Sequence, residues 1–270
     1  MLQIMSKWAT MSSTGVISKG IYVDEDGEEY FVKGNTEPNN KEPYSEVLTS
    51  IILTNLQVPN ITYYLESVKN FKEIKVFGGC EHVCVCKKHE KDLFQFYNGL
   101  CTLLRRRNIN DVLKEYISND FPSEYLIKQL VIDAFIGNQD RHWNNIHFHL
   151  DRTPAPILDC GASLLYNTSE NDLKIYDGSK LGPDKSKPLK DTHREQIHFL
   201  ERKFGIPKLF TLTSKEDFLD KVFKDSEEIF QHLSEKRVNA IKSYLNQRYD
   251  VYIHPYTIYK DFVKSNSLRW

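Results

Sequence analysis

The amino-terminal third of the chain alternates short apolar runs with turn residues, which is typical of a small antiparallel sheet. Residues 21–23 and 29–33 predict a pair of strands, and the Asp-Gly pair within residues 24–27 predicts the hairpin turn between them. Residues 62–75 predict one or two further strands. Residues 83–86 are apolar throughout and predict a strand that is buried on both faces.

Helical periodicity dominates the rest of the chain. The first helical stripe consists of Val47, Leu48, Ile51, Ile52 and Leu56. We expect Ser45 to cap this helix. Further helices are predicted at residues 92–107, 110–117, 122–136, 215–223, 226–233, 235–247 and 256–263, and one opens at residues 191–195.

The helix predicted at residues 122–136 is apolar on nearly every side, so we expect it to be buried. Gly137 stands where a glycine ends a helix. The helix therefore delivers its carboxyl end into the polar segment that follows. The charged segment 166–190, which contains two glycines and two prolines, suits an activation loop or a substrate-facing loop.

Composition and charge narrow the class of protein. The chain has 270 residues, of which 40% are hydrophobic and 27% charged, so it can form a sizeable core. The formal net charge of −1 does not favour direct binding of nucleic acid or of an anionic membrane. No signal peptide and no membrane span is evident. We expect a cytoplasmic protein, or one that is exported without a signal peptide.

One cysteine-rich segment offers two interpretations. Cys80, Cys84 and Cys86 lie near His82 and His89, a set of side chains that could bind zinc. The paired cysteine spacing of structural zinc sites is missing. The odd total of five cysteines suits reduced thiols. We therefore favour a buried strand in which the cysteines act as small apolar residues.

The candidate chemistry lies between residues 137 and 161, which read GNQDRHWNNIHFHLDRTPAPILDCG. Residues 146–150 alternate and predict a short strand, and residues 151–154 predict a turn. A hairpin here would bring Asn145 and Asp159 together, where their oxygens could share a hard cation. Asp140 would then face the substrate.

These are the groups that phosphoryl transfer requires. Kinases hold Mg²⁺ with an Asp and an Asn, and a separate Asp accepts the proton of the attacking hydroxyl. Asn145 follows Asp140 by five positions, as in the catalytic loop of protein kinases. Asp and Asn in loops commonly serve only as turn formers. The combination of both motifs is much less expected by chance than either residue alone.

The segments GNQDRHWNN and APILDCGASLL resemble the HipA-like serine/threonine kinases, and within them the small CtkA-like branch. The resemblance covers about residues 12–196. It implies an α+β, two-lobed protein-kinase-like fold that uses ATP and Mg²⁺. The expected N-lobe, residues 1–86, is a small antiparallel sheet with a nucleotide-binding loop. The expected C-lobe, residues 87–270, is mainly helical and carries the catalytic loop.

The order of a strand ending in Lys33 and a helix containing Glu46 repeats the kinase Lys–Glu ion pair. We therefore expect Glu46 to hold Lys33 against the nucleotide phosphates. The resemblance makes the glycine-containing segment with Gly15, Ser18 and Lys19 a candidate phosphate loop, in which HipA carries an autophosphorylated serine.

Three further residues complete the expected nucleotide site. If the buried strand leads to the hinge between lobes, backbone groups near Cys86 and Lys88 meet the adenine edge. His142 either braces the catalytic loop or contacts phosphate. Catalysis is expected from Asp140, Asn145 and Asp159, and the metal ligands are Asn145 and Asp159.

The sequence thus predicts an ATP-dependent serine/threonine protein kinase with a protein substrate. A HipA-like toxin would also have an antitoxin or another regulatory partner. Two alternatives stay open. The Asp-Arg-His-x-x-Asn order also resembles phosphatidylinositol kinases, which act on lipids, and the chain could instead be a non-catalytic ATP-binding module.

Overall fold

The computed structural model describes residues 19–37, 39–71, 81–88, 123–149, 153–176 and 182–260. The helices predicted at residues 92–107 and 110–117 lie outside these ranges, as do Gly15 and Ser18. None of the helices in the described part combines the length and the apolar character needed to cross a bilayer.

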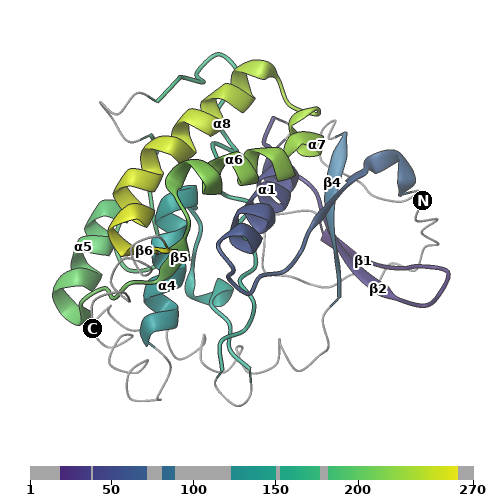
Figure 1. The fold of residues 1–270 in the computed structure, drawn as a ribbon. Coiled ribbons are helices and arrows are strands. Elements are labelled where there is room, and N and C mark those ends of the chain that lie inside the picture. The colour runs from purple at the N-terminus through teal and green to yellow at the C-terminus, as the bar shows by residue number, and fades with distance from the viewer. Residues whose placement is uncertain are drawn as a thin grey trace.

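A four-stranded antiparallel sheet forms the amino-terminal lobe (Figure 1). Its strands are β1 (Lys19–Val23), β2 (Glu29–Lys33), β3 (Tyr64–Ser67) and β4 (His82–Lys87), in the spatial order β1-β2-β4-β3. The predicted turn joins β1 to β2. There the Asp24 carboxylate accepts the backbone N–H groups of Asp26 and Glu28, and Gly27 has a φ of +84°.

Strand β4 is buried on both faces, as its apolar sequence predicted. Val83 and Val85 face a small cluster that includes Tyr22. Cys84 and Cys86 face the main core. Burial raises the pKa of the Cys86 thiol to about 11, so this thiol keeps its proton near neutral pH. Both cysteines therefore act as apolar core residues in this strand.

Helix α1 (Glu42–Asn55) begins before the predicted cap. Pro43 stands in its first turn, where a missing backbone N–H removes no helical hydrogen bond. The prediction that Ser45 caps the helix is wrong. Ser45 lies within the helix, and its hydroxyl donates instead to the carbonyl of Ser163 at 2.9 Å. This bond ties the helix to the segment that follows Asp159.

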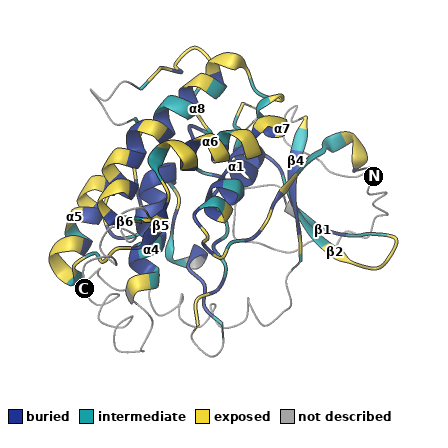
Figure 2. Ribbon diagram, viewed as in Figure 1, coloured by how far each residue is buried: buried dark blue, intermediate teal, exposed yellow. Residues whose placement is uncertain are grey.

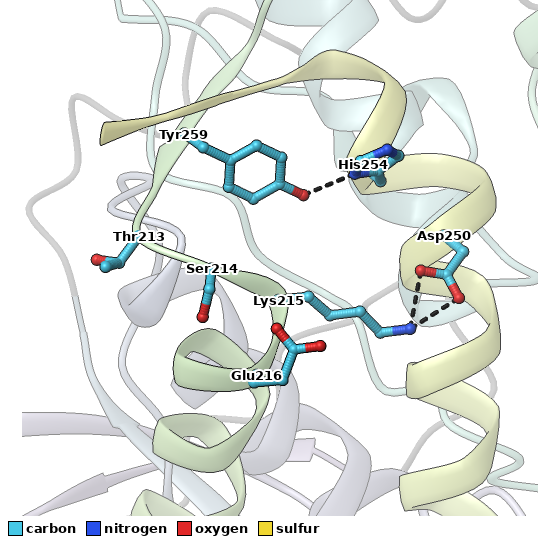
Figure 3. Close-up of a pocket in the computed structure, with 7 residues that line it drawn as sticks. All are labelled: Thr213, Ser214, Lys215, Glu216, Asp250, His254 and Tyr259. Carbon is cyan, nitrogen blue, oxygen red and sulfur yellow. Dashed lines mark hydrogen bonds and ion pairs between the residues drawn. The ribbon is translucent and has the colours of Figure 1, made fainter. Parts of the chain in front are cut away.

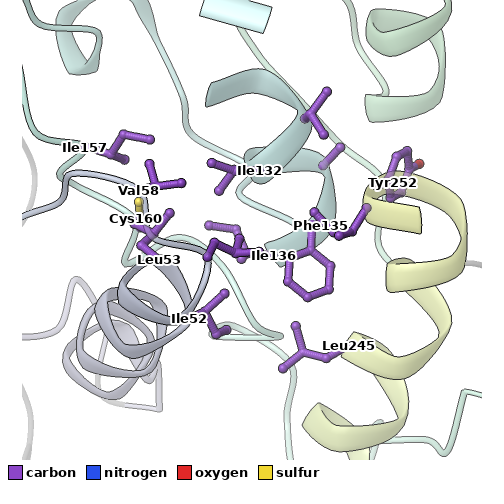
Figure 4. Packing of buried hydrophobic residues seen from close by; sticks show 14 of the residues in the cluster. Ile52, Leu53, Val58, Ile132, Phe135, Ile136, Ile157, Cys160, Leu245 and Tyr252 are labelled. Carbon is purple, nitrogen blue, oxygen red and sulfur yellow. The ribbon is translucent and has the colours of Figure 1, made fainter. Parts of the chain in front are cut away.

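Helix α1 joins the two lobes. It packs against β3 and β4 on one side and against α6 and α7 on the other. Its Ile52 and Leu53 belong to the same hydrophobic cluster as Phe135 and Leu245 of the helical lobe (Figure 4). Because one core runs through both lobes, the position of α1 is fixed from two sides.

The carboxyl-terminal lobe is mainly helical. Its helices are α4 (Ser123–Ile136), α5 (His193–Phe204), α6 (Lys215–Asp225), α7 (Glu227–Phe230) and α8 (Glu235–Arg248). Side chains of Thr192, Ser214 and Ser234 cap α5, α6 and α8 by accepting backbone N–H groups. Helix α4 is almost wholly buried among its neighbours, as predicted (Figure 2).

The helix predicted at residues 256–263 is wrong for the part that the structure describes. A π-helix, Tyr249–Ile253, and a 3-10 turn, His254–Tyr256, follow α8. The chain then forms β6 (Thr257–Tyr259), which pairs in parallel with β5 (Phe210–Leu212). Pro255 and the β-branched pair after Tyr256 disfavour a continuing helix.

The hairpin predicted after Asn145 is present without a regular strand. Phe148 forms a single antiparallel bridge with Pro154. The backbone N–H of His149 donates to the carbonyl of Thr153 at 2.8 Å, and that of Ala155 donates to His147 at 3.2 Å. The chain thus reverses where the sequence predicted, and Ile157 continues toward Asp159.

Candidate active site

The carboxyl end of α4 sets the course of the loop that carries Asp140. Gly137 ends the helix with a φ of +67°. The amide of Asn138 then donates to the Asp133 carboxylate at 2.9 Å. The side-chain oxygen of Asn138 accepts a hydrogen bond from the backbone N–H of Asp140 at 3.1 Å. The position of Asp140 is therefore fixed through a buried polar contact with α4.

Arg141 is fully buried and pairs with Asp133. Its guanidinium donates to both carboxylate oxygens of Asp133, at 2.9 and 3.1 Å. Burial opposes the charged form, but Asp133 outweighs it and keeps the pKa of Arg141 above its ordinary value. A bidentate pair of this kind fixes the orientation of both side chains.

The same guanidinium joins the two segments that carry the proposed metal ligands. Its Nη1 donates to the carbonyl of Asn145 at 2.9 Å and to the carbonyl of Leu158 at 2.7 Å. Leu158 immediately precedes Asp159. The Asn145 carbonyl also accepts the Gln129 amide at 3.2 Å. One side chain thus holds the backbone at Asn145 close to the backbone that precedes Asp159. The meeting of the two side chains over a metal ion stays a prediction.

Lys33 lies at the end of β2 between two carboxylates. Its Nζ donates to Glu46 at 2.8 Å and to Asp159 at 3.0 Å, and the hydroxyl of Tyr63 accepts a third bond at 3.2 Å. Burial opposes the charge on Lys33, but Asp159 and Glu46 outweigh this and raise its pKa well above the ordinary value. The expected ion pair between Lys33 and Glu46 is present.

Glu46 also contacts the backbone next to Asp159. Its second carboxylate oxygen accepts the N–H of Cys160 at 2.8 Å. Asp159 itself adopts a φ of +58°, a left-handed conformation that non-glycine residues rarely take. A Cβ at Gly161 would lie 3.2 Å from Glu46, so the absence of a side chain there permits the close approach of α1.

Asp140 lies on the open side of this arrangement, half exposed. Its carboxylate accepts a bond from Lys187 at 2.6 Å and lies 4.0 Å from the ring of His142. Burial lowers the pKa of His142, although the charges of Asp140 and Asp159 act in the opposite direction. His142 is therefore mainly neutral near pH 7, and it lies within the field of both acids.

The structure places the remaining predicted residues less directly. Lys19 lies opposite Lys33 in the pairing of β1 with β2. Cys86 lies inside β4, opposite Phe31. The backbone N–H of Lys88 donates to the carbonyl of Glu29 at 2.7 Å, so it extends the sheet. Contact of Cys86 and Lys88 with adenine stays a prediction.

Three residues of the site were not singled out from sequence. Asp133 is the acid within the apolar stretch at the carboxyl end of α4, and a charged residue in such a stretch could have identified it. Tyr63 follows an apolar-polar pattern that any strand could show. Lys187 lies in a long charged segment in which sequence spacing does not identify one lysine among several.

The donor set at Asn145 and Asp159 fits magnesium. Mg²⁺ binds through one or two carboxylate oxygens together with phosphate oxygens and water. Asp159 is partly exposed and lies beside Lys33, which can bind phosphate. Asn145 is buried on a segment that Arg141 ties to the residue before Asp159. These residue types therefore suit a metal ion and the phosphates of a nucleotide.

A cavity of about 560 Å³ lies elsewhere in the helical lobe (Figure 3). It is lined by the start of α6 and by residues around β6, where Lys215 pairs with Asp250 at 2.7 and 2.8 Å and His254 contacts Tyr259 at 2.7 Å. None of the predicted site residues within the described ranges lines it. We therefore place the candidate active site around Lys33, Asp140 and Asp159.

The small antiparallel sheet, the joining helix and the helical lobe define a kinase-like fold. Among solved structures, the proinflammatory kinase CtkA of Helicobacter pylori matches with a TM-score of 0.59 and 21% sequence identity, over 100% of this chain and 98% of CtkA. The fold implied by the sequence resemblance is thereby confirmed.

A complex of the toxin–antitoxin proteins HipA and HipB with operator DNA, from Shewanella oneidensis, matches with a TM-score of 0.46 and 14% identity. That match covers 97% of this chain and 68% of the other. No protein-family model matches the sequence, and no curated protein matches it.

Proposed function

We propose that this protein transfers the γ-phosphoryl group of ATP to a serine or threonine hydroxyl of a protein. The observation that carries the proposal is the position of Lys33, whose ammonium contacts both Glu46 and Asp159. A lysine held in this way beside a potential metal ligand is the phosphate-binding arrangement of protein kinases.

Each group has a chemical task in this reaction. Lys33, oriented by Glu46, binds the nucleotide phosphates. Asp140 orients the acceptor hydroxyl and takes its proton. Asn145 and Asp159 would hold Mg²⁺, which offsets phosphate charge when bound. Because the phosphoryl group carries most of the developing charge, positioning and cations supply most of the catalysis.

Two arguments support the proposal. The sequence motifs around Asp140 and Asp159 resemble HipA-like serine/threonine kinases. The fold is similar along the whole chain to that of CtkA, a protein named as a kinase. The choice of a hydroxyl on protein over one on lipid rests on the sequence resemblance.

The test is transfer of label from γ-³²P-ATP and Mg²⁺ to casein, to myelin basic protein and to phosphoinositide vesicles. We expect the wild-type protein to label protein acceptors. Asp140→Asn should reduce transfer by roughly 10²–10⁴-fold, because it removes the general base. Asp220→Asn, which changes an exposed carboxylate on α6, should retain full activity.

The other outcomes identify the alternatives. Labelling of phosphoinositide alone would make the protein a lipid kinase. Calorimetric binding of Mg·ATP without any transfer or hydrolysis would make it a non-catalytic module. Activity of Asp140→Asn equal to that of Asp220→Asn would remove Asp140 from the role of base.

A further inference from the structure

The contact between Lys187 and Asp140 joins two segments far apart in sequence. The ammonium of Lys187 donates to Asp140 at 2.6 Å, with the side chains 46% and 51% exposed. The pair is therefore open to solvent, so an acceptor hydroxyl could reach Asp140 from this side. An exposed contact of this kind adds little to the stability of the fold, which favours a role in phosphoryl transfer.

Lys187 projects from a turn that is held in place on both sides. Ser186 and Leu189 are buried. The backbone N–H of Ser186 donates to Asp191 at 2.8 Å, and that of Leu189 donates to the Gln196 side chain at 3.0 Å. The turn therefore has a defined conformation, and the backbone on both sides of Lys187 is held in place.

The turn is anchored to the same helix that positions Asp140. Asp184, near its start, accepts bonds from Arg248 at 3.2 Å and from Tyr252 at 3.1 Å. Arg248 is fully buried and also donates to the carbonyl of Ala134 in α4 at 2.6 Å. Both the turn that carries Lys187 and the loop that carries Asp140 are thus hydrogen-bonded to α4 or to residues bonded to it. This shared anchor explains how two segments distant in sequence are held next to each other.

The other cations that the structure describes near the site are already engaged. Arg141 is buried, and its donors are used by Asp133, Asn145 and Leu158. Lys33 is held between its two carboxylates, and His142 is mainly neutral. Among the residues that the structure describes, Lys187 is thus the lysine in contact with the proposed base.

We propose that Lys187 is a catalytic residue that contacts the phosphoryl group during its transfer. This inference rests on the proposed function. Before substrates bind, the ammonium of Lys187 pairs with the Asp140 carboxylate. When ATP and the acceptor are in place, the ammonium turns to the non-bridging oxygens of the γ-phosphoryl group and leaves Asp140 to accept a proton.

The chemical step balances without any further reactant. The acceptor oxygen forms a bond to the γ-phosphorus, and the bond between that phosphorus and the β,γ-bridging oxygen breaks. Its electron pair leaves with ADP. The hydroxyl proton moves to Asp140, while Lys187 keeps its proton and offsets the negative charge on the phosphoryl oxygens. Lys33 remains on the phosphates of ADP.

Kinetics of Lys187→Ala, Lys187→Arg and Lys185→Ala test the proposal. Lys185 is an exposed lysine in the same turn and is the matched control. We expect Lys187→Ala to lower kcat for protein labelling about 100-fold, the typical effect of removing one group that stabilises transition-state charge. The KM for ATP should change little, Lys187→Arg should recover part of kcat, and Lys185→Ala should match wild type.

A binding measurement gives a second readout that needs no acceptor. Mg·ADP with aluminium fluoride imitates the transferred phosphoryl group, and Mg·ADP alone does not. Lys187→Ala should bind Mg·ADP as wild type does and should lose most of the extra affinity for the aluminium fluoride complex. A lysine that only stabilised the turn would leave the ratio of the two affinities unchanged.

The outcomes separate this proposal from the proposed function. If wild type transfers phosphate and Lys187→Ala equals Lys185→Ala in both kinetics and binding, the role of Lys187 is overturned and the kinase function stands. If wild type labels no acceptor and binds no Mg·ADP, both fail together. Equal melting temperatures of the three variants would exclude unfolding as the cause of lost activity.

Discussion

Arg141 links more parts of the candidate site than any other side chain described above. It binds Asp133 in α4, the carbonyl of Asn145 and the carbonyl of Leu158. A planar guanidinium can serve all three partners at once, whereas the single ammonium of lysine cannot. The geometry of the loop around Asp140 therefore depends on an arginine specifically.

Replacement of Arg141 should destabilise the protein strongly. We expect Arg141→Ala to lower the free energy of unfolding by about 3–5 kcal/mol, because it leaves the buried Asp133 carboxylate without its partner. Arg141→Lys should recover only part of this loss. Urea unfolding measures the effect, and Arg202→Ala, at an exposed position of α5, is the control, with an expected change within about 0.5 kcal/mol.

The buried thiols predict a loss of stability in alkaline solution. Burial raises the pKa of Cys86 to about 11 and that of Cys160 to about 12. In the unfolded chain a thiol titrates near pH ~8.5, so above that pH the unfolded state releases protons that the native state retains. The contribution of the buried thiols to the free energy of unfolding is therefore fully present below pH ~8.5. It falls as the pH rises toward the pKa values of the native state, by up to ~1.4 kcal/mol per pH unit for each thiol.

Urea unfolding at pH 7, 8.5 and 10 measures this dependence. The double substitution Cys86→Ala and Cys160→Ala should reduce the decline between pH 8.5 and 10, and the part that remains is expected from Cys84, whose pKa burial also raises. An equal decline in the double variant would show that other groups cause it. Buried tyrosines begin to contribute near pH ~10, which sets the upper limit of the experiment.

At the scale of single residues, the sequence predicted what local motifs encode. Asp140, Asn145 and Asp159 stand in short motifs with fixed spacing, and Lys33 and Glu46 follow the order of strand and helix. Lys187 reaches Asp140 only because the chain folds back over 47 positions. No periodicity or spacing in the sequence indicates a contact between residues so far apart.

At the scale of elements, the end of α4 constrains what can stand at position 137. Gly137 has a φ of +67°, and a Cβ there would overlap the hydroxyl of Tyr244. That hydroxyl donates to the carbonyl of Pro183 at 3.2 Å, next to Asp184. The helix end, α8 and the turn that carries Lys187 therefore meet at one glycine.

Gly137→Ala should destabilise the protein by more than Gly27→Ala. The left-handed backbone costs roughly 1–2 kcal/mol in both variants. At Gly137 the overlap with Tyr244 adds roughly 1–3 kcal/mol, whereas a Cβ at Gly27 meets open space. Thermal unfolding of the two variants provides the comparison. Similar melting temperatures would mean that Tyr244 moves aside freely.

Most element types could be predicted, and the failures have physical causes. Helices with a clear apolar stripe and a Ser or Thr cap, such as α5, α6 and α8, agree with prediction. The predicted start of α1 was wrong because the Ser45 hydroxyl donates to the distant carbonyl of Ser163 and does not cap the helix. Strand β6 was missed because its pairing partner β5 lies far away in sequence, and only that pairing decides between helix and strand.

At the scale of the whole molecule, the two lobes share one hydrophobic core through α1. In protein kinases, movement of the helix that carries the glutamate controls the Lys–Glu pair. Here α6 and α7 cover the outer side of that helix (Figure 1). We therefore expect Lys33 and Glu46 to remain paired whether or not nucleotide is bound.

Nucleotide should stabilise the whole molecule in a manner that depends on the metal. Mg·ADP at 100 times its dissociation constant should add about 2.7 kcal/mol to the free energy of unfolding. Asp159→Asn should remove the difference between Mg·ADP and ADP with a chelator, because it removes the anionic ligand. Differential scanning fluorimetry measures both, with Asp220→Asn as control. A persistent magnesium effect in Asp159→Asn would place the metal elsewhere.

The ion pair between Lys33 and Asp159 affects the order in which nucleotide and magnesium are expected to bind. With this ammonium at 3.0 Å, the carboxylate is already neutralised and attracts a bare dication only weakly. Under the proposed function, the triphosphate of ATP would draw the ammonium to itself, and Asp159 would become available to a magnesium ion that the nucleotide has chelated. We therefore expect Mg·ATP to bind as a single complex and free magnesium alone to bind weakly.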